Sequence, residues 1–140
     1  MKALNATEFK SAFMAANDAG TAYMQSSPLW VQIWIGIMMV VLLPAFVLMF
    51  KYREARWVAW SMVLLGIWTP LLMMAAGPSR LWGITHLSFW TPVVCVAVAA
   101  IIRNGTESKY QKWLVAVAAV MSISLVFDLI DVIRFFSGEV

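Results

Sequence analysis

Four long stretches without a formal charge constrain this chain more than any other feature of its sequence. Residues 19–50, 57–79 and 81–102 contain no Asp, Glu, Lys or Arg, and residues 113–127 form a fourth such stretch. A helix needs about 20 apolar residues to span the hydrocarbon core of a bilayer. The stretches are continuously apolar and do not alternate, and four strands are too few for a barrel, which needs about eight. We therefore predict an all-α integral membrane protein.

The predicted fold is a bundle of four transmembrane helices near residues 29–50, 57–76, 81–102 and 113–136, which together form one domain over residues 29–140. The composition agrees with this prediction. Hydrophobic residues make up 63% of the chain and charged residues 12%, whereas soluble domains average about 45–50% and 25%.

Residues 1–28 form a separate N-terminal segment, in which we predict a short amphipathic helix. Asn5, followed three residues later by Glu8, matches a capping box, and apolar residues recur beyond it at helical spacing. Ser26, Ser27 and Pro28 then end the helix. We expect this segment to lie in the outer membrane interface or to pack over the mouth of the bundle.

The distribution of basic residues predicts the orientation. Positively charged residues in short loops are retained in the cytoplasm, and six of them follow the first and third spans, against four spread over the other face. We therefore predict both termini outside the cytoplasm and a location in a bacterial inner membrane. The net charge of +3 then reflects orientation, and without a basic stripe it predicts no nucleic-acid partner. The six basic residues that follow the first and third spans are Lys51, Arg53, Arg56, Arg103, Lys109 and Lys112.

The fourth span holds a carboxylate that this topology cannot place in a loop. Trp113 to Phe127 would cover about 22 Å of helix, which is too short for a core of about 30 Å. The helix must therefore continue through Asp128, with Asp131 nearer the edge of the core and Arg134 at the interface. Because a charge at the bilayer centre costs about 2.5–3.5 kcal/mol on insertion scales, Asp128 should face protein or water.

Three interpretations of this acidic stripe stay open. In the first, Arg134 or Arg80 pairs with a carboxylate and fixes the helix packing. In the second, Asp128 and Asp131, with Ser124 one turn deeper, form an acidic ring or cation site in an oligomer. The third is catalysis, which has the least support because the chain offers no defined nucleophile or cofactor ligands. We therefore do not predict an enzyme.

His86 is the only histidine in the chain and falls in the third span at about the depth of Asp128. A proton relay and a mixed histidine–carboxylate metal site are both compatible with this placement, as is a histidine bonded to a single neighbour. Cys95 is the only cysteine, so neither a histidine pair nor a thiolate cluster exists. We predict no haem, iron–sulfur or structural zinc cofactor.

Three of the predicted spans contain a proline that should bend the helix, namely Pro44, Pro70 and Pro92. Thr69 and Thr91 precede the second and third of these prolines in a repeated Trp-Thr-Pro tripeptide. The carbonyls freed by proline and the threonine hydroxyls either line a polar cavity or satisfy one another and their neighbours.

The sequence thus predicts a small polytopic membrane protein, with the bilayer as its surroundings, that forms a homo-oligomeric cation or proton channel or transporter with an acidic outer-leaflet site. Small residues four apart, such as Cys95 and Ala99, favour close helix packing, and four short helices enclose little volume, which favours an oligomer. The alternative is a non-catalytic subunit or assembly factor that docks on a membrane protein partner. The predicted ion pathway or buried polar site comprises Asp128, Asp131, Ser124, His86, Thr69 and Thr91, with Arg134 and Arg80 as charge partners.

Overall fold

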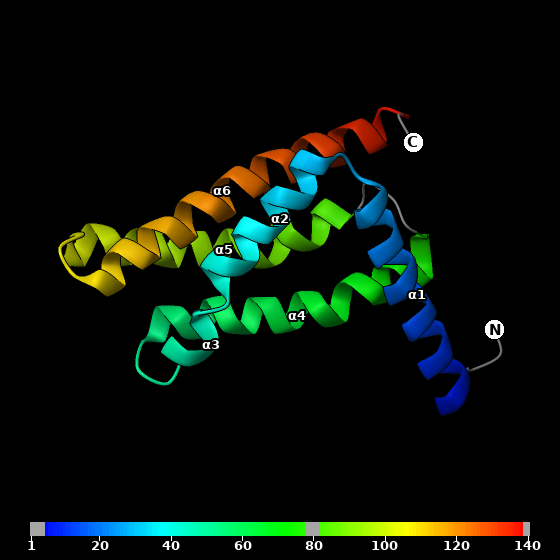
Figure 1. Ribbon diagram of the computed structural model, residues 1–140, viewed down its shortest axis with the longest axis horizontal. Helices are drawn as coiled ribbons and strands as arrows, with labels where there is room; N and C mark the ends of the chain where they lie inside the picture. Colours follow the sequence, from blue (N-terminus) through cyan, green and yellow to red (C-terminus); the bar gives the residue numbers. More distant parts are fainter. Residues whose placement is uncertain (1–4, 78–81, 139–140) are drawn as a thin grey trace.

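The computed structural model describes residues 5–77 and 82–138, and within these ranges the chain is helical and has no strand (Figure 1). Four helical segments are long and apolar enough to cross a membrane. An all-α fold with four helices of membrane-spanning length is therefore confirmed for the described residues. The helices are α1 (Ala6–Ser26), α2 (Leu29–Leu42), α3 (Ala45–Leu48), α4 (Arg53–Ala76), α5 (Trp82–Asn104) and α6 (Lys109–Phe136).

Two of these helices begin four residues earlier than predicted, at Arg53 and at Lys109. Arg53 and Arg56, which we assigned to a loop, lie at the start of α4, and Lys109 and Lys112 lie at the start of α6. Ser108 caps α6, because its side-chain oxygen accepts the Gln111 backbone N–H at 3.1 Å. An uncharged stretch marks only the part of a helix suited to hydrocarbon, and the helix itself continues beyond that part.

The first span is interrupted at Pro44, since α2 ends at Leu42 and α3 begins at Ala45. The Trp113 indole N–H on α6 donates to the Val41 carbonyl beside this break at 2.9 Å. A neighbouring helix thus satisfies backbone at the interruption, as apolar surroundings require. By contrast, α4 and α5 continue as helix through their internal prolines.

The N-terminal segment forms a helix with the predicted capping box. Asn5 Oδ1 accepts the Glu8 N–H and Glu8 Oε2 accepts the Asn5 N–H, both at 2.9 Å. Figure 1 shows α1, in blue, crossing α4 at a steep angle. The two helices approach closely at Gly20, where an added Cβ would lie 2.7 Å from Met73 Cε.

The core of the bundle lies where α5 packs against both α4 and α6, with α2 against α6 and α3 against α4 (Figure 1). We call the end where α2 and α5 begin the α1 end, and the opposite end, where α4 and α6 begin, the basic end. Buried core residues come from all five of these helices. They are Leu42, Ala45, Val58, Ala59, Leu65, Trp90, Val93, Val117 and Met121.

Candidate functional site

A histidine and an aspartate from neighbouring helices meet near the α1 end. His86 Nδ1 on α5 lies 3.2 Å from Asp128 Oδ1 on α6. Their side chains are 28% and 18% exposed. The structure thus brings together two residues that lie 42 positions apart in the sequence, both of which we had predicted as site residues.

A backbone contact between α5 and α6 positions this pair. Gly83 is buried against Asp128, and a Cβ added to it would lie 2.6 Å from the Asp128 carbonyl oxygen. Residues three apart share a helix face, so His86 lies on the face of α5 that Gly83 brings onto α6. The absence of a side chain at Gly83 therefore allows the imidazole to reach the carboxylate.

The two groups have unequal surroundings. The His86 ring lies on the Trp90 indole, with ring centroids 4.6 Å apart, and Trp90 is only 4% exposed. Asp128 Oδ2 is buried, and no described group of the protein donates a hydrogen bond to it. The direction of the bond between Nδ1 and Oδ1 depends on where the proton lies, because imidazole and carboxyl can each donate or accept.

Ser124, one turn from Asp128 along α6, belongs to a different set of contacts. The Trp34 indole N–H on α2 donates to Ser124 Oγ at 3.0 Å. The Ser124 hydroxyl in turn lies 2.8 Å from Met38 Sδ, also on α2. Ser124 is buried, and its bonds link α2 to α6.

The two remaining charged candidates on α6 lie in its last turns. Asp131 is half-buried and Arg134 is exposed, and both make further interactions. Arg80, the other predicted charge partner of Asp128, lies outside the described residues. Within residues 5–77 and 82–138, no group of three His, Cys, Asp or Glu side chains is placed to hold a metal ion.

The threonines of the repeated tripeptide have different surroundings. Thr69 Oγ1 lies 3.4 Å from Thr85 Oγ1 and so joins α4 to α5. Thr91 is exposed, and its hydroxyl donates to the Leu87 carbonyl of its own helix at 2.6 Å. These two threonines are therefore not brought together with each other or with Asp128.

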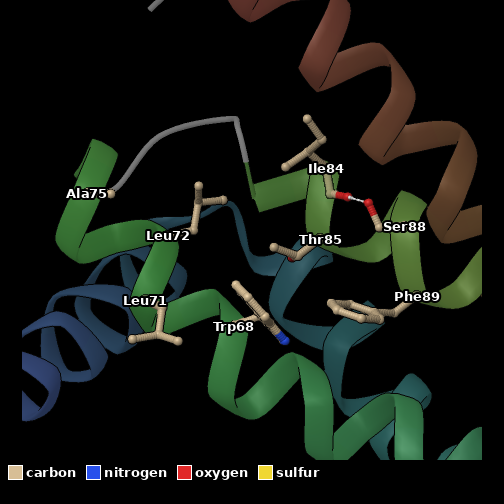
Figure 2. Close-up of a pocket in the computed structure, with 8 residues that line it drawn as sticks. All are labelled: Trp68, Leu71, Leu72, Ala75, Ile84, Thr85, Ser88 and Phe89. Carbon is tan, nitrogen blue, oxygen red and sulfur yellow. Dashed lines mark hydrogen bonds between the residues drawn. The ribbon is translucent and has the colours of Figure 1, made fainter.

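An apolar hollow of about 420 Å³ lies between α4 and α5 near the α1 end (Figure 2). Figure 2 shows the Ser88 hydroxyl bonded to the Ile84 carbonyl at 2.8 Å, so the polar group of Ser88 is engaged by its own helix. Neither His86 nor Asp128 lines this hollow. The lining residues are Trp68, Leu71, Leu72, Ala75, Ile84, Thr85, Ser88 and Phe89.

A second polar cluster, at the basic end, was missed by the sequence analysis. Glu54 Oε1 lies 3.8 Å from Arg103 Nη2, and the Tyr110 hydroxyl donates to Glu54 Oε2 at 3.2 Å. The Glu54 side chain is only 12% exposed. Our predicted second span began at residue 57, so Glu54 fell in the loop before it. The available signal was a single acidic residue among the basic residues at positions 51–56, at the same predicted end of the bundle as Arg103.

Comparisons with models of known protein families, with curated proteins and with solved structures found no match to this chain. The class of protein is therefore described from the fold and the candidate site alone. The chain has four helices suited to crossing a membrane and a partly buried histidine–aspartate pair between the last two of them.

Proposed function

We propose that this chain is a small integral membrane protein that passes protons or other cations, and that His86 and Asp128 form the site at which the ion binds. One observation carries the proposal. A carboxylate between two apolar helices has one oxygen on an imidazole nitrogen and the other buried without a donor.

The unpartnered oxygen explains why this pair is suited to binding a proton or a cation. A buried polar atom without a partner costs about 1–3 kcal/mol, and more when it is charged. A proton or a cation at Asp128 Oδ2 removes that cost. A proton that passes from the Asp128 carboxyl to Nδ1 of His86 leaves a carboxylate that the imidazolium neutralises, and the imidazole can then release that proton, so the pair supports repeated binding and release.

The partial exposure of the pair supports a homo-oligomer. His86 and Asp128 retain access to the bundle surface, with 28% and 18% of their side chains exposed, and the apolar hollow between α4 and α5 lies elsewhere. A charged group facing lipid is costly. A second copy placed against α5 and α6 would enclose the pair and the path to it. We place this site in the outer leaflet of a bacterial inner membrane, with both termini outside the cytoplasm.

Flux through the reconstituted protein tests the proposal. Purified protein in liposomes should dissipate a proton or cation gradient, and Asp128→Asn should abolish this flux because the amide cannot bind a proton or a cation in the same way. Asp18→Asn is a matched control, since Asp18 is an exposed carboxylate on α1. Flux that is unchanged in Asp128→Asn, or absent from the unaltered protein, would overturn the proposal.

The single histidine permits a second measurement on the same pair. Protein labelled with ¹⁵N-histidine gives the imidazole signals of His86 alone, and these signals report the tautomer and protonation of the ring. Asp128→Asn should change both, because the nitrogen would lose its carboxylate neighbour. Unchanged signals would show that the two side chains do not interact.

The alternative, a non-catalytic subunit or assembly factor of a larger membrane complex, predicts the opposite pattern. The chain would co-purify in mild detergent with a different membrane protein in fixed ratio, would form no homo-oligomer, and would give no flux after reconstitution. That combination of results would replace the proposal by the alternative.

A further inference from the structure

A second hollow lies on the outer face of α4 at the basic end. Arg53, Arg56, Trp57 and Trp60 line it, and its volume is about 420 Å³. These positions are separated by three, one and three residues, a spacing that places all of them on one helix face. One stretch of α4 therefore forms the site, with the arginines nearer the start of the helix and the tryptophans nearer its middle.

The positive charge of this hollow has no internal counterion among the described residues. Glu54 lies between the two arginines in sequence, but its carboxylate is turned inward to Arg103 and Tyr110. The side chains of Arg53 and Arg56 are exposed, and no ion pair or hydrogen bond joins them to a described residue. Two guanidinium groups thus face outward side by side without an acidic partner.

The two tryptophans of the hollow are exposed as well. Trp57 is 48% exposed and Trp60 is 58% exposed. Neither indole nitrogen has a hydrogen-bond partner in the described part of the chain. Tryptophan rings favour the level of the headgroups and glycerol in a bilayer, where one edge of the ring meets polar groups and its faces meet apolar chains.

We propose that this hollow binds the headgroup of an anionic phospholipid. The arginines would hold the lipid phosphate, because the planar guanidinium fork matches phosphate oxygens with two parallel hydrogen bonds. Trp60 lies four residues beyond Arg56, or about 6 Å deeper along the helix. Its ring is therefore at the height of the glycerol and ester groups when the phosphate lies at the arginines.

Charge complementarity selects this occupant over a zwitterionic lipid. The choline group of phosphatidylcholine carries a positive charge that neutralises the phosphate of the same lipid. Phosphatidylglycerol has no such cation, so the arginines can neutralise its phosphate. Basic sites at membrane surfaces accordingly favour anionic headgroups. The proposal rests on the membrane insertion proposed above but not on ion flux. A failure of lipid binding and a failure of flux are therefore separate results.

Binding of a fluorescent phosphatidylglycerol to the whole chain in neutral detergent micelles tests the arginines. Replacing Arg53 or Arg56 by Gln should weaken binding about fivefold each, and replacing both about thirtyfold, since one basic residue near a membrane surface contributes about a factor of five. Lys109→Gln with Lys112→Gln removes the same charge from the same end outside the hollow. This control should change binding less than about twofold, because salt screens distant charges.

A second variant separates a shaped site from diffuse charge. Trp57→Ala with Trp60→Ala keeps every charge and should still weaken phosphatidylglycerol binding about tenfold by removing two walls of the hollow. Excess inorganic phosphate should not displace the lipid, and phosphatidylcholine should bind more weakly. Equal losses in the arginine and lysine variants, full binding in the tryptophan variant, or displacement by free phosphate would each overturn the proposal.

Discussion

Replacing Gly83 with alanine tests the contact on which the His86–Asp128 pair depends. The new Cβ would lie 2.6 Å from the Asp128 carbonyl oxygen, whereas carbon and oxygen atoms in weak contact stay about 3.3–3.6 Å apart. Because the obstacle is backbone and cannot rotate away, α5 and α6 must separate locally by about 0.7–1.0 Å. The present distance of 3.2 Å between Nδ1 and Oδ1 would then grow to about 4 Å, which is too long for a hydrogen bond.

The expected cost combines three effects. Overpacking destabilises by about 1–3 kcal/mol, the lost hydrogen bond by about 0.5–1.5 kcal/mol, and the better helix propensity of alanine returns about 0.5–1 kcal/mol. We therefore expect Gly83→Ala to lower the free energy of unfolding by about 0.5–4 kcal/mol. Unfolding by SDS in mixed micelles, followed by circular dichroism, measures this difference.

Two other helical glycines provide matched controls. An added Cβ at Gly36 or at Gly66 meets no atom within 4 Å, so alanine at either position should be neutral or stabilise by up to about 1 kcal/mol. The imidazole signals of His86 should change in Gly83→Ala and stay the same in both controls. If Gly83→Ala is as stable as the controls, or leaves the His86 signals unchanged, the inferred backbone contact is wrong.

Three further substitutions test other contacts by the same unfolding measurement. Trp113→Phe removes the donor to the Val41 carbonyl beside the helix break and should cost about 1 kcal/mol; a loss below about 0.3 kcal/mol would show that this bond contributes little. Gly20→Ala should cost less than about 0.5 kcal/mol, because the two nearest atoms it meets are the flexible end of the Met73 side chain and the third, Trp82 Cη2, is 3.3 Å away; a loss as large as that of Gly83→Ala would contradict this reasoning. Tyr110→Phe keeps the ring but removes the hydroxyl that donates to Glu54, and should cost about 1 kcal/mol; equal stability of the two proteins would argue against that bond.

The helices of this fold could be predicted because the signal for them is local. A long uncharged stretch needs a helix in hydrocarbon whatever it packs against, and most described residues of each of the four stretches are helical. Two helix starts were predicted four residues too late, and the reason is physical. Arg53 and Lys109 have long side chains that reach polar surroundings from the first turn of a helix. A charged residue near an apolar stretch therefore does not mark where the helix begins.

Which faces of the helices pack together could not be predicted from spacing alone. Cys95 and Ala99 are small residues four apart on α5, and both are exposed. Ala97 and Ala100, on another face of the same helix, are almost completely buried. Small residues occur on more than one face of α5, and the choice between the faces depends on neighbours distant in sequence.

The candidate site could be predicted only in part, because its geometry also depends on which helix faces meet. Counting residues from the helix end placed His86 and Asp128 at similar depth. Their contact, however, requires α5 and α6 to meet on the faces that carry them, and this depends on the approach of two backbones at Gly83. No pattern in the sequence marked that glycine as different from Gly36 or Gly66.

Two partly buried carboxylates of the bundle, Glu54 and Asp128, differ in how completely their oxygens are partnered. Glu54 and Asp128 are similarly buried, at 12% and 18% exposed. Both oxygens of Glu54 have partners, Arg103 on one and Tyr110 on the other, and a satisfied group of this kind holds helices together. Among the described residues, Asp128 has a partner for Oδ1 only. Because an incomplete set of partners lowers stability, the buried Oδ2 is the feature on which the proposed binding of a proton or a cation rests.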